Sequence, residues 1–203
     1  DTKLLTESLL KKYPKKKWVI DGGSLQTMDP SFIPKDAILT PHRKEFETLF
    51  GFSEGNIQKT EDGKRMTDSR NTEKTDKAEN QSSVESVQSA IRLQSSVLSH
   101  LTKEYNCIIL LKGERDIICS PTECVEIEGG NAGMTKGGTG DVLAGLVAAL
   151  YCKNDDPFLV ASCASYINKK AGESLFKKVG YYFNASNLAD EIPPTMKELI
   201  PAI

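Results

Sequence analysis

The sequence predicts an α/β fold in which helices cover a mainly parallel sheet. Short apolar runs that end in turn residues alternate with longer segments whose apolar residues recur at helical spacing, and this alternation is typical of strands joined by helices. A chain of 203 residues is also long enough to bury a substantial core within one domain. We therefore expect residues 1–203 to form a single domain.

The first quarter of the chain contains two of the expected strands. Residues 18–20 are a buried apolar strand that runs into Asp21 and two glycines, and residues 37–40 repeat this pattern before Pro41. Residues 45–50 follow as a short helix. A helix over residues 2–13 precedes the first strand. Its leucines, which we expect on one side, are Leu4, Leu5, Leu9 and Leu10.

Residues 53–82 differ from the rest of the chain. They are rich in Ser, Thr, Asn, Asp, Glu and Lys, and Ile57 and Met66 are almost the only large apolar residues among them. Such a segment buries too little apolar surface to offset the entropy lost on ordering. We expect most of it to be a flexible insertion within the domain, because the elements on either side belong to one sheet.

The second half of the chain supplies the rest of the layers. A strand expected after the insertion brings the clear core strands to about three, which is few for a sheet covered on both faces. A hairpin with a turn near Pro121 follows it. In chain order we expect a helix over 84–105, strands over 107–111, 116–119 and 124–127, and helices over 141–151, 157–178, 185–191 and 195–199.

Charge and hydropathy exclude several classes of partner. The formal net charge is -2, so nothing global favours binding to nucleic acid or to an anionic membrane. A local basic run at Lys11-Lys12 and Lys15–Lys17 is interpreted as a solvated helix end, with a nucleic-acid patch as the weaker alternative. No apolar run approaches the ~20 residues of a membrane span, and the first residues do not follow a secretory pattern. We expect neither a nucleic acid nor a membrane as partner.

The five cysteines are odd in number and scattered. Their spacing suits neither a zinc site nor a disulfide framework, and several lie in apolar runs where cysteine acts as a small core residue. We therefore expect free thiols and a cytoplasmic location. The cysteines are Cys107, Cys119, Cys124, Cys152 and Cys163.

The stretch from Gly130 to Gly145, which reads GNAGMTKGGTGDVLAG, carries the strongest chemical signal. Its glycines allow a sharp turn and let a phosphate approach backbone amides, and the apolar helix that follows adds free N–H donors and a positive dipole end. Asp141 would lie in the first helical turn, where it can act as a general base beside a bound phosphate. A helix cap without any ligand is the alternative. The Walker spacing is absent.

This stretch resembles the signature of the ADP/ATP-dependent NAD(P)H-hydrate dehydratases, which belong to the ribokinase-like superfamily. Four further segments match that family in the right order. They are Val19–Leu25 (VIDGGSL), Leu39–Phe46 (LTPHRKEF), Leu111–Asp116 (LKGERD) and Asn184–Leu188 (NASNL) with Ile192-Pro193. The resemblance covers nearly the whole chain apart from the insertion.

The resemblance implies a ribokinase-like three-layer sandwich and an enzyme that repairs hydrated NADH and NADPH. ATP or ADP phosphorylates the ring hydroxyl, with Mg²⁺ to neutralise charge, and phosphate then leaves to restore the double bond. Asp141 would be the catalytic base. The nucleotide-binding residues implied are Lys112, Gly113, Glu114, Arg115, Asp116, Asn131, Ala132, Gly133, Met134, Thr135, Lys136, Gly137, Gly138, Thr139 and Gly140. The hydrate-binding residues implied, besides Asp141, are His42, Arg43, Lys44, Glu45, Phe46, Glu47 and Thr48.

The sequence departs from the family pattern at its start. Members of the family have about two more βα units, including a Gly-rich loop, before the segment that contains Asp21, so we expect an N-terminally truncated domain. It would act as a homo-oligomer or together with a separate N-terminal half. A related vitamin-precursor kinase and a catalytically silent nucleotide-binding fragment are the alternatives. The choice between ATP and ADP, and the metal ligands, stay open.

Overall fold

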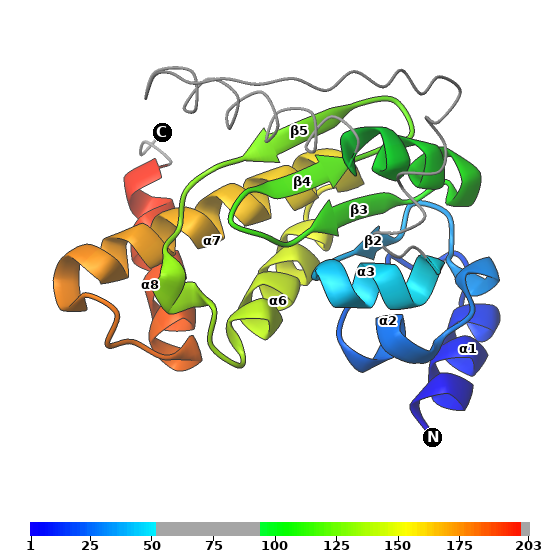
Figure 1. Ribbon diagram of the computed structural model, residues 1–203, viewed down its shortest axis with the longest axis horizontal. Coiled ribbons are helices and arrows are strands. Elements are labelled where there is room, and N and C mark those ends of the chain that lie inside the picture. Colours follow the sequence, from blue (N-terminus) through cyan, green and yellow to red (C-terminus); the bar gives the residue numbers. More distant parts are fainter. Residues whose placement is uncertain (52–93, 200–203) are drawn as a thin grey trace, which may run out of the picture.

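A five-stranded sheet forms the centre of the computed structural model, which describes residues 1–51 and 94–199 (Figure 1). The strands lie in the order β1 (Val19–Ile20), β2 (Ile38–Leu39), β3 (Ile108–Leu111), β4 (Asp116–Cys119) and β5 (Cys124–Ile127). The first three are parallel, with Val19 opposite Ile38 and Ile38 opposite Ile108. The hairpin β4–β5 adds two antiparallel strands. The α/β prediction is confirmed. The sheet is mixed, and its parallel part consists of β1, β2 and β3.

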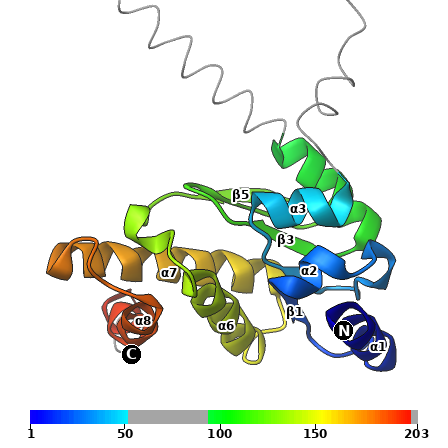
Figure 2. The ribbon, with the colours of Figure 1, turned by 60° about the horizontal axis from the view of Figure 1, so that its bottom comes forward.

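Side chains of the strands alternate between two apolar cores, as the period of two in a strand requires. Leu39, Ile109 and Ile117 belong to one core, which also holds residues of α1 (Thr2–Lys12), α2 (Gly23–Thr27), α3 (Arg43–Phe50) and the helical residues 94–105. Ile38, Ile108, Leu110 and Ile118 face the other core, under α6 (Thr139–Tyr151) and α7 (Pro157–Val179). Figure 2 shows α3 on one side of the sheet and α6 and α7 on the other.

The helices begin and end for identifiable reasons. Gly51, at φ 70°, ends α3 as expected for a left-handed C-cap. Asp156 accepts hydrogen bonds from Phe158 and Leu159 and so starts α7, with Pro157 in the first turn. Within the described residues, the 3₁₀ turns Pro30–Phe32 and Ala132–Met134 complete the connections. None of the helices within residues 1–51 and 94–199 is long and apolar enough to cross a membrane.

Two expectations about helices differ from the structure. The predicted pieces 185–191 and 195–199 are one helix, α8 (Ala185–Leu199), which continues through Pro193 and Pro194. Packing of its buried face, which includes Leu188 and Ile192, against α7 outweighs the local cost of the prolines. In α1 only Leu10 is buried, whereas Leu4 and Leu5 are 68% and 63% exposed. The predicted insertion at 53–82 lies outside the described residues.

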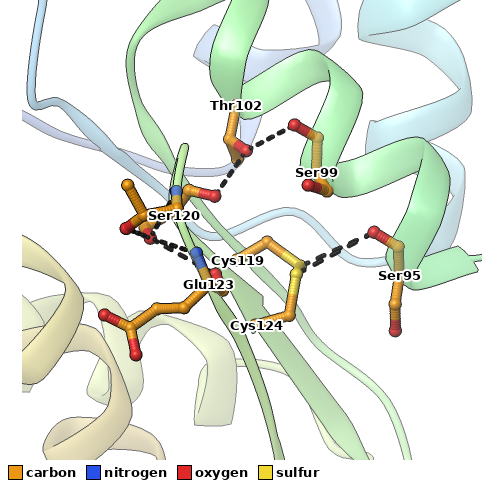
Figure 3. Close-up of a disulfide and its surroundings, with 8 residues drawn as sticks. Ser95, Ser99, Thr102, Cys119, Ser120, Glu123 and Cys124 are labelled. Atoms are coloured by element: carbon orange, nitrogen blue, oxygen red, sulfur yellow. Dashed lines mark hydrogen bonds between the residues drawn. A yellow bond between two sulfur atoms is a disulfide. The ribbon is translucent and has the colours of Figure 1, made fainter.

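The expectation that all cysteines are free thiols is wrong. Cys119 and Cys124 face each other across the hairpin, with Cα atoms 4.1 Å apart, and form a disulfide (Figure 3). Ser120 next to it accepts the hydrogen bonds that close the turn, from the N–H groups of Thr122 and Glu123. The pairing arises because the hairpin register places two cysteines directly opposite one another. The cysteine pattern therefore no longer argues for a reducing compartment.

Candidate active site

The carboxyl ends of the three parallel strands meet at one edge of the sheet. Asp21 follows β1, His42 comes shortly after β2, and Lys112 follows β3 directly. The N–H of Lys112 donates to the carbonyl of Pro41 at 2.8 Å, so the pairing of β2 with β3 extends as far as His42 and Lys112. Open α/β sheets bind ligands at this edge.

The ammonium of Lys112 is the centre of charge at this edge. It donates to a carboxylate oxygen of Asp21 at 2.7 Å and lies 3.9 Å from a carboxylate oxygen of Glu45. The hydroxyl of Thr40 donates to the same oxygen of Asp21 at 2.8 Å. The side chains of Lys112 and Asp21 are 18% and 17% exposed, so their attraction is screened less than that of a surface pair. The cluster fixes where Lys112 points.

His42 and Glu45 form a reciprocal cap at the start of α3. The N–H of Glu45 donates to Nδ1 of His42 at 3.2 Å, and the N–H of His42 donates to the Glu45 carboxylate at 2.9 Å. This capping box fixes Nδ1 as an acceptor, because it receives a backbone hydrogen bond. The imidazole is half-exposed and the Glu45 side chain is buried. The cap holds both residues at the strand-end edge, and Gln26 and Lys112 add contacts to the Glu45 carboxylate at 3.4 and 3.9 Å.

The remaining residues predicted to bind the hydrate lie along α3. Phe46 is buried in the core and packs against Phe50 with its ring tilted, with ring centroids 5.1 Å apart. Arg43 pairs with Glu47 at 3.0 Å. Thr48 donates its hydroxyl to the carbonyl of Lys44 one turn earlier. These contacts give α3 its shape, and only its first turn lies at the strand ends.

The start of α6 lies beside Lys112. Gly138 adopts φ 90° before the first turn, a conformation that favours glycine, and within the described residues no side chain caps the helix there. A Cβ atom placed on Gly140 would lie 3.4 Å from the Lys112 ammonium. The hydroxyl of Thr139 donates to the carbonyls of Met134 and Lys136 and so holds the preceding turn. Asp141 is exposed in the first turn, next to backbone amides that are ready to bind an anion.

A pocket of about 650 Å³ lies between Lys112 and the start of α6, and its volume is typical of a small-ligand site. Asp21, the predicted hydrate-binding residues 42–48 and Asp141 do not line it. Most of its lining residues come from two segments, the turn after β3 and the glycine stretch. Four of the predicted nucleotide-binding residues do not line it: Gly133, Lys136, Gly137 and Gly138. The predicted residues that do are Lys112, Gly113, Glu114, Arg115, Asp116, Asn131, Ala132, Met134, Thr135, Thr139 and Gly140.

Comparison with known proteins decides which family this site belongs to. A family model described as NAD(P)H-hydrate dehydratase matches residues 1–194. The chain belongs to the NAD(P)H-hydrate dehydratase family. The bifunctional NAD(P)H-hydrate repair enzyme Nnr of Archaeoglobus fulgidus is 35% identical over 191 residues, which are 94% of this chain and 31% of that protein.

Two further relatives of this dehydratase-family chain confirm the predicted resemblance and fold. The ADP-dependent (S)-NAD(P)H-hydrate dehydratase of Cenarchaeum symbiosum is 31% identical over 163 residues, covering 80% of this chain and 45% of that protein. The ADP/ATP-dependent NAD(P)H-hydrate dehydratase from Bacillus subtilis, co-crystallised with ATP and Mg²⁺ and soaked with CoA, shares the fold with a TM-score of 0.64 at 23% identity. That match covers 91% of this chain and 57% of the other. The chain thus spans between about a third and three fifths of the length of these relatives.

Within the dehydratase-family site, Lys136 turns away from the pocket. Its ammonium donates to the carbonyls of Tyr181 and Phe183, the latter at 2.7 Å, and lies 4.9 Å from the centre of the Phe183 ring. Gly133 packs against the same ring, where a Cβ atom would come within 2.8 Å. These two residues join the glycine stretch to the segment before α8. We propose that they support the site and do not touch the nucleotide.

Six residues that line the pocket were not among the predicted nucleotide-binding residues. Gly130 and Leu143 lie within the glycine stretch itself, and the other four lie outside it. Glu128 and Gly129 follow β5, and Asn168 and Lys169 lie in the middle of α7. Asn168 is buried, and its side-chain oxygen has no hydrogen-bond partner within the described parts of the chain. A buried acceptor without a donor is costly, and a polar ligand in the pocket would supply one. The sequence feature that could have revealed Asn168 and Lys169 is the presence of polar residues on the buried face of α7, where apolar residues are expected.

One face of α7 holds the glycine stretch in place. The side-chain amide of Asn131 donates to the carbonyl of Gly172 at 2.8 Å, and the N–H of Gly130 donates to Glu173 at 3.2 Å. A hydrogen bond from Lys170 lowers the pKa of the Glu173 carboxyl despite its partial burial, and the Gly130 N–H adds to this. Glu173 therefore stays ionised and keeps accepting the Gly130 N–H at neutral pH.

The donor set fits a Mg²⁺ ion that arrives with a nucleotide. The described residues contain no group of three or more His, Cys, Asp or Glu side chains that could hold a metal ion by themselves. Mg²⁺ at phosphoryl-transfer sites is usually held by one or two carboxylates, water and the phosphates of the substrate. Asp141 is the carboxylate placed beside the amides of the α6 start, where such phosphates would lie.

Proposed function

We propose that this chain carries out the nucleotide-dependent dehydration of hydrated NADH and NADPH. The observation that carries the proposal is the joint lining of one pocket by the LKGERD turn and the glycine stretch, with Lys112 beside Gly140 at the strand ends. The printed activities of the relatives, an ADP-dependent (S)-NAD(P)H-hydrate dehydratase among them, support the same substrate.

The nucleotide would lie along this pocket with its phosphates at the start of α6. The amides of Gly138, Thr139 and Gly140 and the helix dipole offer a preorganised site for the transferring phosphoryl group. Lys112 adds a fixed positive charge next to Gly140. The unpartnered acceptor of Asn168 marks the pocket as one that takes a polar ligand. Mg²⁺, carried on the phosphates, would neutralise the charge that develops during transfer.

Asp141 would start the reaction as a general base. Its carboxylate takes the proton of the ring hydroxyl, and the hydroxyl oxygen then attacks the terminal phosphorus of ATP or ADP. The bond between that phosphorus and the bridging oxygen breaks, and ADP or AMP leaves. In the second step the ring carbon–oxygen bond breaks, the neighbouring ring carbon loses a proton, and inorganic phosphate departs. Phosphate is a far better leaving group than hydroxide, so the nucleotide drives formation of the double bond.

The hydrate would approach from the strand-end side. The capping box holds His42 at the start of α3 on that side, and Asp141 follows Gly140, the residue of α6 that approaches Lys112. We propose His42 to Thr48 as the segment nearest the hydrate, with the backbone and the first turn making the contacts, because Phe46 is in the core and Arg43 pairs with Glu47. We propose a cytoplasmic location, where NADH and NADPH are available to be hydrated. We propose a homo-oligomer, which light scattering of the purified chain tests.

A coupled assay tests the proposal. Purified hydrate is incubated with the chain, Mg²⁺ and either ATP or ADP, and the absorbance of the reduced nicotinamide is followed. We expect absorbance to return only with nucleotide, and the comparison of ATP with ADP gives the preferred donor. Asp141→Asn should abolish the return, whereas Asp190→Asn, which changes an exposed aspartate on α8, should not.

Two outcomes would replace the proposal with another function. Phosphorylation of a different alcohol without any recovery of reduced nicotinamide would identify a ribokinase-like kinase. Nucleotide binding that survives Asp141→Asn, with no turnover in the unmodified chain, would identify a silent nucleotide-binding module. Binding is read from thermal shifts that grow with nucleotide concentration.

A further inference from the structure

Lys169 is a charged residue buried in the middle of α7. It is 5% exposed, and its ammonium lies 2.9 Å from the carbonyl oxygen of Glu114 and 3.3 Å from those of Gly113 and Gly129. A carboxylate oxygen of Asp116 lies 3.4 Å away. An ammonium has three hydrogens to donate, and three carbonyls take them. The Lys169 ammonium therefore has no hydrogen left to donate to a ligand.

The three carbonyls belong to two separate walls of the pocket. Gly113 and Glu114 form the turn between β3 and β4, and Gly129 follows β5. Asp116 strengthens the first wall, because it accepts the N–H of Gly113 at 2.9 Å and the hydroxyl of Ser165 on α7 at 2.7 Å. The ammonium of Lys169 thus joins two loops just beyond the last residue pair of the β4–β5 ladder, Asp116 with Ile127, where the ion pair of Arg115 with Glu128 at 3.2 Å also links them.

The carbon chain of Lys169 supports the glycine backbone as well. Gly129 and Gly130 have φ values of 112° and 76°, which favour glycine, and Cβ atoms placed on them would lie 3.7 Å and 3.5 Å from carbons of Lys169. The backbone of this segment therefore lies directly on the lysine stem. Lys169 therefore supports the 129–130 segment with its stem and bonds Gly129 and the 113–114 turn with its ammonium, while Glu173 also holds the Gly130 N–H.

We propose that Lys169 is the positioning residue for nucleotide binding in this site. It sets the separation of the two pocket walls, so that the affinity for nucleotide depends on it while the chemistry at Asp141 does not. This inference rests on the proposed function, since it names the residue that shapes the nucleotide site. A buried ion pair that served stability alone would have no reason to place all three donors on pocket-lining backbone.

Isothermal titration with ATP and ADP, combined with steady-state kinetics, tests the inference. Lys169→Met keeps the stem and removes the donors. We expect the Kd and the KM for nucleotide to rise about tenfold or more, which is the effect of losing one to two hydrogen bonds to an ionised donor, with kcat at saturating nucleotide changed by less than about threefold. Lys178→Met is the matched control, because it removes another paired lysine of α7 outside the pocket. It should leave Kd unchanged.

A second variant covers a loss of folding. Lys169→Met leaves the Asp116 carboxylate buried without a cation, so Lys169→Met combined with Asp116→Asn is measured alongside it. Weaker nucleotide binding by either folded variant, with kcat retained, supports the inference. Unchanged Kd and KM in a folded variant, or a loss confined to kcat, overturns it. An unmodified chain that binds neither nucleotide contradicts the proposed function itself, and this inference with it.

Discussion

The ion pair between Lys112 and Asp21 should stabilise the fold as well as orient the lysine. At the 2.7 Å separation and an effective dielectric constant of about 20, the Coulomb attraction is about 6 kcal/mol before the cost of removing both charges from water. Desolvation consumes most of that, and hydrogen bonds between ionised groups contribute about 1.5–3 kcal/mol net. For a chain of this size, a loss of about 2 kcal/mol lowers Tm by about 4–8 °C. We expect that shift for Asp21→Asn.

The chain offers a matched control for this variant. Asp155 lies at the same 2.7 Å from Lys17, but its side chain is 98% exposed, so Asp155→Asn should leave Tm nearly unchanged. Thermal unfolding followed by circular dichroism without nucleotide separates this effect from ligand binding. Equal shifts for the two variants, or no loss for Asp21→Asn, would refute the argument that partial burial gives the Lys112 pair its strength.

Three further predictions concern the disulfide, a buried thiol and an acid-sensitive contact. Replacing both Cys119 and Cys124 with alanine should lower the free energy of unfolding by about 2 kcal/mol, as expected for so short a closed loop, and urea denaturation that shows no loss would argue against the bond. Burial raises the pKa of the Cys107 thiol to about 12, so a thiol reagent at neutral pH should modify exposed Cys152 and Cys163 and reach Cys107 only after unfolding; rapid modification of all three would contradict this. Burial alone would raise the pKa of Glu191, but hydrogen bonds from Lys178 and Ser174 outweigh it and lower the pKa below its ordinary 4.5. Because the pKa of Glu191 is lower in the folded state, its contribution is present above about pH 4.5 and is lost as the pH falls through the folded pKa. Urea denaturation should therefore show Glu191→Gln costing about 1 kcal/mol at neutral pH and little in acid, and an equal cost at both pH values would count against it.

Much of the fold follows from sequence periodicity and turn residues. The strands at 18–20, 37–40 and 107–111 could be predicted because each apolar run ends at a polar or proline residue. The convergence of Asp21, His42 and Lys112 follows from parallel pairing. The helix through Pro193 could not be predicted, since its continuity depends on packing against α7 and local propensity argues for a break.

The predicted site differs from the observed pocket at residues whose placement depends on tertiary packing and not on their position in the sequence. Lys136 lies within the glycine stretch, but carbonyls of the segment before α8 bind its ammonium outside the pocket. Lys169 is 28 positions after Asp141 in the chain, and only the packing of α7 on the sheet brings it to the pocket wall. Cys119 and Cys124 pair because the hairpin register places them opposite one another. The turn near Pro121 predicts a hairpin, but the sequence does not define where its two strands end, so the register could not be predicted.

The fate of the hydroxyl oxygen tests the proposed reaction most directly. Hydrated NADH that carries oxygen-18 in its ring hydroxyl is incubated with the chain, Mg²⁺ and unlabelled nucleotide, and the inorganic phosphate is analysed by mass spectrometry. Because phosphorylation would precede cleavage of the carbon–oxygen bond, we predict one labelled oxygen in each phosphate released and none in water. Label in water, or recovery of NADH without labelled phosphate, would contradict the mechanism assigned to Asp141 and the start of α6.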